Sequence, residues 1–298
     1  MTSPQFGRLL TAMVTPFASD GSIDHEVATQ VAKFLVSEGS DGLVIAGSTG
    51  EGTSLSDEEK LELFKTVANA VTVPVIAGST SSDTARSVDL TAKVKATGVA
   101  GILATTPAYA RPSQRGIELH LEAVAQSTTL PVMLYDIPSR TGRKIESETS
   151  ISLVQNNKNI VALKDASADL DQARKTKSAL GDSFDLYSGD DSLVLDFMSI
   201  GGVGVVSVAS HWASPEFSQM INSFVTGDLK TAGRIKELLV DSCSFEGTLQ
   251  YPNPMPSKAA MRYLGFNVGQ CRLPHAPSDA ALDTKAVDIV TALRAARG

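Results

Sequence analysis

The sequence predicts an α/β protein, a (β/α)₈ barrel with a helical extension at its C-terminal end. Three observations predict it. The chain of 298 residues is long enough for one barrel, which takes about 250 residues, and for a further segment. Eight short apolar runs alternate with amphipathic segments, and these runs stop near residue 225. We therefore expect residues 1–225 to form the barrel and residues 226–298 to form a C-terminal helical region.

The eight apolar runs have the composition of strands buried on both faces of a parallel sheet, because polar residues do not alternate with apolar ones along them. The runs are Leu9–Thr15, Gly42–Ala46, Val73–Ala77, Gly101–Thr105, Pro131–Tyr135, Ile160–Leu163, Asp185–Tyr187 and Gly204–Val208. Eight strands that are each followed by a helix close into a barrel. A doubly wound open sheet is the alternative, but the first run is not followed by the GxGxxG loop that often marks that fold.

Helix starts are recognisable between the runs. Ser56 is followed three residues later by Glu59, which is the pattern of a capping box, and apolar side chains then recur at helical spacing. Asp83 and Ser113 precede two further helical segments. Beyond residue 225 we expect helices over Asp228–Phe245, Pro256–Leu264 and Pro277–Ala296. The proline-rich stretch 251–256 links the first two of these helices.

The composition argues against several classes of protein. Hydrophobic residues make up 42% and charged residues 20% of the chain, as in ordinary soluble proteins. A net charge of −7 argues against a general nucleic-acid or membrane-surface binder. We see neither a signal peptide nor an apolar run of the ~18 residues that a membrane span requires, so we expect a cytoplasmic protein. The two cysteines and four scattered histidines form no local metal-binding pattern, and we expect no metal.

Two candidate catalytic side chains end neighbouring strands, at the barrel rim where active sites lie. Lys164 ends the sixth run, and an amine held among apolar residues can lose its charge and attack a ketone. Tyr135 ends the fifth run, and a phenol beside an iminium can relay protons. Each residue also has a simpler interpretation, in which Lys164 extends into solvent and Tyr135 packs at the top of the barrel.

Two rim loops carry candidate carboxylate-binding groups. The hydroxyls of Ser48 and Thr49, in a glycine-rich turn after the second run, suit a small carboxylate, or else cap the next helix. Arg140 lies in a rigid turn beyond Tyr135 and can hold a second carboxylate, although a loop arginine that points into water is equally common.

Two further rim segments are ambiguous. Tyr109, after the fourth run, is either another phenol of the site or a packing or interface residue. Asp190 and Asp191, after the seventh run, are more typical of a cap for a helix over Leu193–Ser199 than of ligands.

The most specific segment of the chain is Tyr135–Gly142. Together with Ser188–Asp191, Leu195–Met198 and Gly201–Val208, it gives the chain a close resemblance to the dihydrodipicolinate synthase family. That family belongs to a group of class I aldolases that includes N-acetylneuraminate lyase. The resemblance covers nearly the whole chain, from residue 12 to residue 274.

The resemblance implies a reaction and its catalytic residues. Pyruvate would form an imine with Lys164 and then condense with L-aspartate 4-semialdehyde, in the committed step towards diaminopimelate and lysine. Tyr135 would relay protons together with Ser48 and Tyr109, and the family's counterpart of Tyr109 reaches in from a neighbouring subunit. No cofactor beyond the covalent imine is implied, and the assembly would be a homotetramer or a homodimer.

The resemblance also implies substrate-binding residues. Thr49 and the backbone at Val206 would hold pyruvate. Arg140 and the backbone near Gly189 would receive the carboxylate of L-aspartate 4-semialdehyde. Another pyruvate-dependent aldolase, such as a neuraminate lyase or a 2-keto-3-deoxy-sugar-acid aldolase, is the nearest rival. A metal-dependent aldolase and a non-catalytic binding barrel are more distant alternatives.

The chain departs from the family pattern at several positions. Ser48 stands where the family usually has threonine, so a hydroxyl is kept, and Ala108 replaces a tyrosine that packs at the dimer interface in many members. Members inhibited by lysine carry a pocket near that interface, and Arg86 replaces its glutamate. The pocket's other counterparts here are Asp57, Lys60, Ser82 and Ala108. An arginine would repel the ammonium of lysine, so we expect weak or absent inhibition by lysine.

Overall fold

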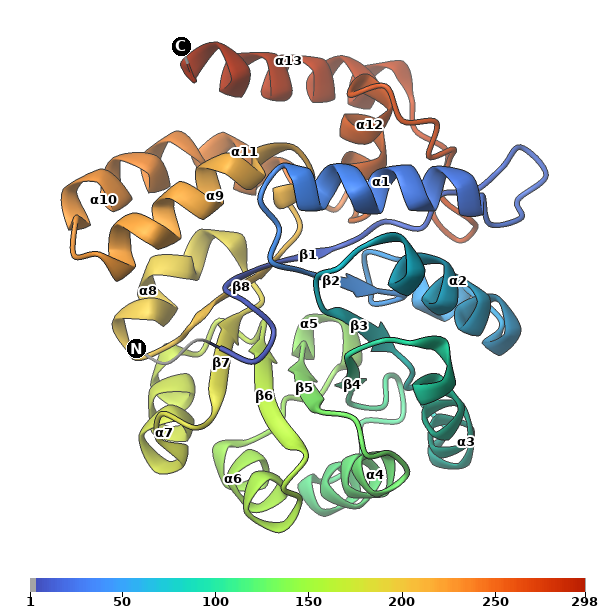
Figure 1. Ribbon diagram of the computed structural model, residues 1–298, viewed down its shortest axis with the longest axis vertical. Helices are drawn as coiled ribbons and strands as arrows, with labels where there is room; N and C mark the ends of the chain where they lie inside the picture. Colours follow the sequence, from blue (N-terminus) through green and yellow to red (C-terminus); the bar gives the residue numbers. More distant parts are fainter. Residues whose placement is uncertain (1–3, 298) are drawn as a thin grey trace.

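The computed structural model describes residues 4–297, which form a closed barrel of eight parallel strands ringed by helices (Figure 1). The strands are β1 (Leu9–Ala12), β2 (Gly42–Ile45), β3 (Val75–Gly78), β4 (Gly101–Thr105), β5 (Val132–Asp136), β6 (Ile160–Asp165), β7 (Asp185–Ser188) and β8 (Gly204–Ser207). Each strand pairs with its neighbours in sequence, and β8 closes on β1 with Val206 opposite Leu10. The predicted fold class is confirmed.

Helices follow the strands as predicted. The first nine are α1 (His25–Ser37), α2 (Asp57–Ala70), α3 (Thr84–Val94), α4 (Gln114–Gln126), α5 (Pro138–Thr141), α6 (Ser147–Asn156), α7 (Leu170–Leu180), α8 (Val194–Ser199) and α9 (Ser210–Val225). The capping box of Ser56 and Glu59 is present at the start of α2. Asp83 and Ser113 cap α3 and α4 by accepting hydrogen bonds from backbone N–H groups. None of these helices is both long and apolar enough to span a membrane, and the same holds for the rest of residues 4–297.

Side chains at alternate strand positions fill the interior of the barrel. Leu10, Ile76 and Met133 belong to this inner cluster, and so does Ala162 on β6. Since side chains along a strand alternate between its two faces, the residue two positions after Ala162 also points inward. That residue is Lys164. Apolar side chains therefore fill the interior of the barrel, and an amine follows them at the C-terminal end of β6.

The C-terminal helices are α10 (Leu229–Leu238), α11 (Val240–Phe245), α12 (Met255–Tyr263) and α13 (Ala280–Ala296). They share an apolar cluster with α9, in which the rings of Trp212 and Phe245 meet edge to face at 5.6 Å. In Figure 1 this group of helices lies on the side of the barrel formed by α9 and α1. The division of the chain at residue 225 stays a prediction, because α9 shares one core with the helices that follow it.

The helix predicted over Asp228–Phe245 is two helices. It breaks at Leu239, whose N–H donates to the carbonyls of both Ile235 and Lys236, at 3.0 Å and 3.2 Å. Leu239 is buried in the C-terminal core. The apolar spacing on either side of the break is helical, and for this reason the sequence pattern did not show it.

Candidate active site

Lys164 and Tyr135 are in contact at the rim of the barrel. They are register partners on β6 and β5, and only 4% of Lys164 is exposed. The Nζ atom of Lys164 lies 4.3 Å from the centre of the Tyr135 ring. A cation over the face of a phenol ring is electrostatically favourable. The order of the strands predicted that Lys164 and Tyr135 are neighbours, and their side chains do form a contacting pair.

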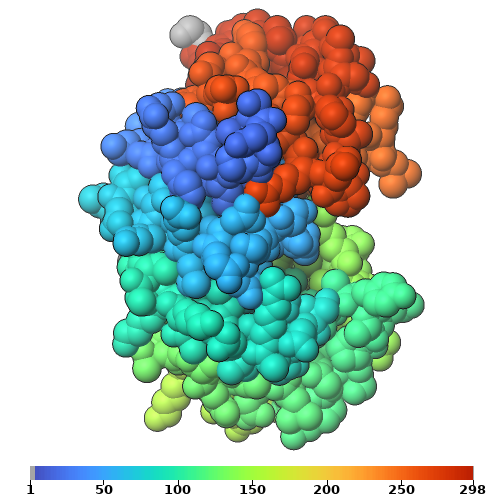
Figure 2. Space-filling view, turned by 90° about the vertical axis from the view of Figure 1, so that its right-hand side faces the viewer, coloured from blue at the N-terminus to red at the C-terminus, as the bar shows by residue number. Residues whose placement is uncertain are grey.

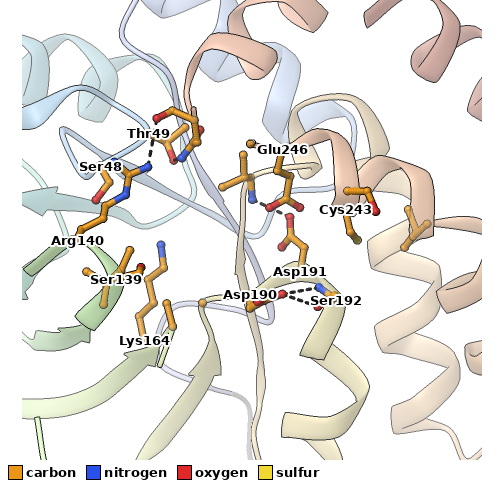
Figure 3. A pocket seen from close by; sticks show the side chains of 18 of the residues that line it. Ser48, Thr49, Ser139, Arg140, Lys164, Asp190, Asp191, Ser192, Cys243 and Glu246 are labelled. Carbon is orange, nitrogen blue, oxygen red and sulfur yellow. Dashed lines mark hydrogen bonds between the residues drawn. The ribbon is translucent and has the colours of Figure 1, made fainter. Parts of the chain in front are cut away.

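A cavity of about 530 Å³ lies above this pair, and Figure 3 shows Lys164 pointing up into it. Its volume lies within the range of small-molecule sites. Of the predicted site residues, the cavity is lined by Ser48, Thr49, Tyr135, Arg140, Lys164 and Gly189. Hydroxyls, a guanidinium and an amine thus surround one space. This arrangement suits a small ketone that carries a carboxylate.

Asn253 connects two of the predicted residues across the cavity. Its Nδ2 donates to Thr49 Oγ1 at 2.9 Å, and its carbonyl accepts from Arg140 Nη2 at 3.2 Å. Sequence reasoning did not identify Asn253, since it treated the stretch 251–256 only as a link between helices. The available signal was a polar side chain flanked by two prolines, which fix the backbone around it.

The structure also places the predicted residues Tyr109, Val206 and Gly189. Tyr109 is 98% exposed and does not line the cavity of its own chain. Val206 is buried in the interior of the barrel on β8, two residues before Val208, which follows the strand and lines the cavity. The N–H of Gly189 donates to the Asp165 carbonyl at 2.7 Å, so this donor is already engaged.

The acidic pair after β7 was predicted to cap the helix over Leu193–Ser199, but only Asp190 has a capping role. The Oδ1 atom of Asp190 accepts from the Ser192 N–H at 2.9 Å and caps a short 3₁₀ helix before α8. Asp191 instead accepts from the N–H groups of Val208 and Ala209, at 2.9 Å and 2.7 Å. It thereby fixes the turn between β8 and α9 rather than the start of α8.

Two titratable groups from the C-terminal helical region also line the cavity, and the sequence did not indicate them. Burial and the neighbouring Asp191 raise the pKa of Glu246 well above its usual range. Burial likewise raises the pKa of Cys243 to about 12, with the charge of Asp191 adding to the shift. A thiol that stays protonated is a poor nucleophile, which leaves Lys164 as the stronger candidate.

Residues 5–293 match the model of the dihydrodipicolinate synthetase family. The chain belongs to this family. The synthetase family model thus covers the barrel, the lysine on β6 and nearly all of the C-terminal helices. The resemblance read from the residues at the rim of the barrel is confirmed.

Named relatives of the synthetase family match along most of the chain. The 4-hydroxy-tetrahydrodipicolinate synthase of Moorella thermoacetica is 45% identical over 272 residues, which cover 91% of this chain and 92% of that protein. The 4-hydroxy-tetrahydrodipicolinate synthase 2 of Halalkalibacterium halodurans is 47% identical over 274 residues, covering 91% and 93%. A crystal structure of dihydrodipicolinate synthase from Cyanidioschyzon merolae with lysine bound has a TM-score of 0.94 and 42% identity, and covers 98% of this chain and 99% of that one.

Proposed function

We propose that this chain is a lyase of the 4-hydroxy-tetrahydrodipicolinate synthase type, which condenses pyruvate with L-aspartate 4-semialdehyde. The observation that carries the proposal is the buried amine of Lys164, in contact with the Tyr135 ring at the base of the cavity. A class I aldolase requires such an amine, held away from bulk water beside a group that can relay protons. The names of the relatives support the same reaction.

The first half of the reaction builds the imine. The amine of Lys164 adds to the ketone carbon of pyruvate, and loss of water gives the imine. Tyr135 transfers protons in these steps, together with Ser48 and with Tyr109 of a neighbouring subunit. Thr49 and the backbone at Val206 hold the pyruvate moiety, and the bond from Asn253 fixes the Thr49 hydroxyl.

The second half forms the carbon–carbon bond and releases the enzyme. Loss of a proton from the methyl group turns the imine into an enamine, whose carbon attacks the aldehyde of the second substrate. Arg140 and the backbone near Gly189 hold the carboxylate of that substrate. The amine of the adduct then attacks the imine carbon, closes the ring and displaces Lys164. These steps need no metal and no cofactor besides the covalent imine.

Location and assembly belong to the same proposal. A biosynthetic enzyme of this kind works in the cytoplasm on small molecules, without nucleic-acid or membrane partners. The exposed Tyr109 supports a homodimer or homotetramer in which this side chain enters the site of another subunit.

The experiment that tests the proposal is pyruvate consumption by the purified protein, with and without L-aspartate 4-semialdehyde and in the presence of a chelator. We expect consumption only with the semialdehyde, at a rate that the chelator does not change. Loss of activity with the chelator would support a metal-dependent aldolase. If pyruvate is trapped on Lys164 by borohydride but consumed only with sugar aldehydes, the chain is a sugar-acid aldolase instead.

A further inference from the structure

A buried ion pair connects the loop after β2 to the C-terminal helical region. Glu51 Oε1 lies 2.6 Å from the Nζ of Lys258 on α12, and the two side chains are 0% and 1% exposed. Burying two charges costs more than their attraction returns unless the geometry is favourable and other hydrogen bonds assist. A pair so deeply buried therefore needs a reason beyond overall stability, and the position of Glu51 two residues after the cavity-lining Thr49 suggests one.

The turn that carries Glu51 holds a strained backbone. Ala46 and Glu51 have φ angles of 51° and 53°, in the left-handed region that non-glycine residues rarely adopt. The turn is also closely packed, because a Cβ atom on Gly52 would lie 2.0 Å from the carbonyl oxygen of Ala46. Strained backbone of this kind persists only where surrounding contacts hold it in place.

Glu51 and Lys258 receive those contacts from the C-terminal segment and from Phe17 near the N-terminus. The Nζ of Lys258 donates to the Gln270 carbonyl at 3.0 Å and lies 4.1 Å from the centre of the Phe17 ring. The second oxygen of Glu51 accepts from the N–H of Arg272 at 2.8 Å. Figure 2 shows the red C-terminal segment against the blue and cyan part of the chain, where these contacts lie.

The same two stretches of chain meet a second time, inside the cavity. Thr49 lies two residues before Glu51, and Asn253 lies five residues before Lys258. The ion pair between Glu51 and Lys258 holds the same two stretches of chain together that the hydrogen bond from Asn253 to Thr49 joins. We propose that Glu51 and Lys258 are positioning residues that set the Ser48–Thr49 turn for the carboxylate of pyruvate. This inference rests on the proposed function, which assigns that turn to pyruvate.

The test is the pyruvate concentration that gives half-maximal trapping on Lys164 by borohydride, followed by mass spectrometry of the intact protein. In Glu51→Gln the shape is kept but Lys258 loses its counter-charge. We expect the half-saturating concentration to rise about ten- to a hundredfold, as small displacements of binding groups do, while the maximal extent of trapping stays unchanged. This readout does not depend on the second substrate.

Glu59→Gln is the matched control. Arg272 Nη1 donates to Glu59 Oε2 at 2.9 Å, so this variant weakens another anchor of the same C-terminal segment while the groups that contact Glu51 directly are kept. Glutamine also preserves the capping box. We expect Glu59→Gln to lower the Tm and to leave the half-saturating pyruvate concentration as it is. An equal rise in both variants means that the pair acts only through overall stability, and the inference is then wrong.

A double variant keeps the test decisive if Glu51→Gln folds poorly. Glu51→Gln with Lys258→Met removes both charges, which buried pairs often tolerate. We expect a Tm close to that of the unmodified protein and a half-saturating concentration that stays raised. If the half-saturating pyruvate concentration returns to its normal value together with the Tm, the inference is wrong.

The same experiment separates this inference from the proposed function. Absence of trapping in the unmodified protein overturns the proposed function and this inference with it. Normal trapping with no change in Glu51→Gln overturns the inference alone.

Discussion

Arg140 is the residue that separates the proposed reaction from that of a sugar aldolase. It is exposed at the cavity rim, and within residues 4–297 its guanidinium makes one hydrogen bond, to the Asn253 carbonyl, which leaves further N–H donors for a ligand. A guanidinium fork matches a carboxylate in bidentate fashion. A sugar aldehyde has no carboxylate that would need a cation at the position of Arg140.

We expect Arg140→Ala to lose the reaction with L-aspartate 4-semialdehyde by about a hundredfold or more in kcat/KM, because a charge-assisted bidentate contact is removed. Imine formation with pyruvate should remain, as measured by borohydride trapping. Arg143→Ala is the control, since Arg143 is exposed in the same loop and does not line the cavity. Full synthase activity in Arg140→Ala would show that another group receives the carboxylate.

The site residues that could be predicted from the sequence are those at strand ends. Lys164 and Tyr135 follow short apolar runs, and parallel strands bring such ends to one rim. Asn253 could not be predicted in this way, because its contact with Thr49 joins positions 204 residues apart through the path of the C-terminal region. Apolar periodicity carries no information about that path.

At the scale of elements, the ends of β5 and β6 carry a pair of buried carboxyl groups. Asp136 and Asp165 are register partners, and each follows a catalytic candidate by one residue. Burial, with a smaller contribution from the charge of Asp165, raises the pKa of Asp136 to about 7. Asp136 also accepts from the Ile145 N–H at 3.1 Å, and so holds the loop that follows α5.

This raised pKa predicts that stability falls as the pH rises. The contribution of Asp136 is complete below its unfolded pKa of 3.8 and is lost as the pH approaches about 7, because the folded protein then retains a proton that the unfolded chain releases. Asp136→Asn should be more stable than the unmodified protein at pH 8, by on the order of 2–4 kcal/mol, and should lose this advantage near pH 4. Thermal melts across this range measure it, with exposed Asp288→Asn as the control. A constant difference at all pH values would contradict the assignment.

The strands and helices themselves were largely predictable, with errors at their ends. The first run extends to Thr15, but β1 ends at Ala12, and beyond it the Thr15 hydroxyl bonds to the Gly50 carbonyl in a loop. The break at Leu239 was missed for a related reason. Burial selects an apolar side chain equally well in a strand, a helix or the loop between two helices, so composition alone does not locate the boundary.

At the scale of the whole molecule, the expectation of weak or absent inhibition by lysine rests on the region around Arg86. The guanidinium of Arg86 holds Asp57 through Nε and Nη2, both at 3.0 Å. Arg86 is thus partly neutralised, but its partner carboxylate is no longer free for an ammonium group. We expect no inhibition of pyruvate consumption by lysine up to about 1 mM, which corresponds to weak binding. Arg86→Glu should increase the sensitivity to lysine, and strong inhibition of the unmodified protein at micromolar lysine would refute the expectation.

In the proposed assembly, a neighbouring subunit would complete each active site. Tyr109 has a φ angle of 68° and projects almost fully into solvent from the loop after β4. A strained and exposed phenol is unexplained in an isolated chain, but it is accounted for if the loop enters another subunit. In a two-fold dimer, each such contact occurs twice and is reciprocal. One site would then hold Lys164 of its own chain and Tyr109 of its partner.

Mixing two inactive variants tests this arrangement. Lys164→Ala lacks the amine and Tyr109→Phe lacks the phenol hydroxyl, so each protein alone should have little activity. When the two are unfolded together and refolded, mixed dimers contain one site with both groups intact, and about a quarter of the unmodified activity should return. Refolding each variant separately before mixing is the control. If Tyr109 acted within its own chain, every site would lack one group and no activity would return. Recovery would therefore place the proton relay across the subunit interface and make assembly a requirement of catalysis.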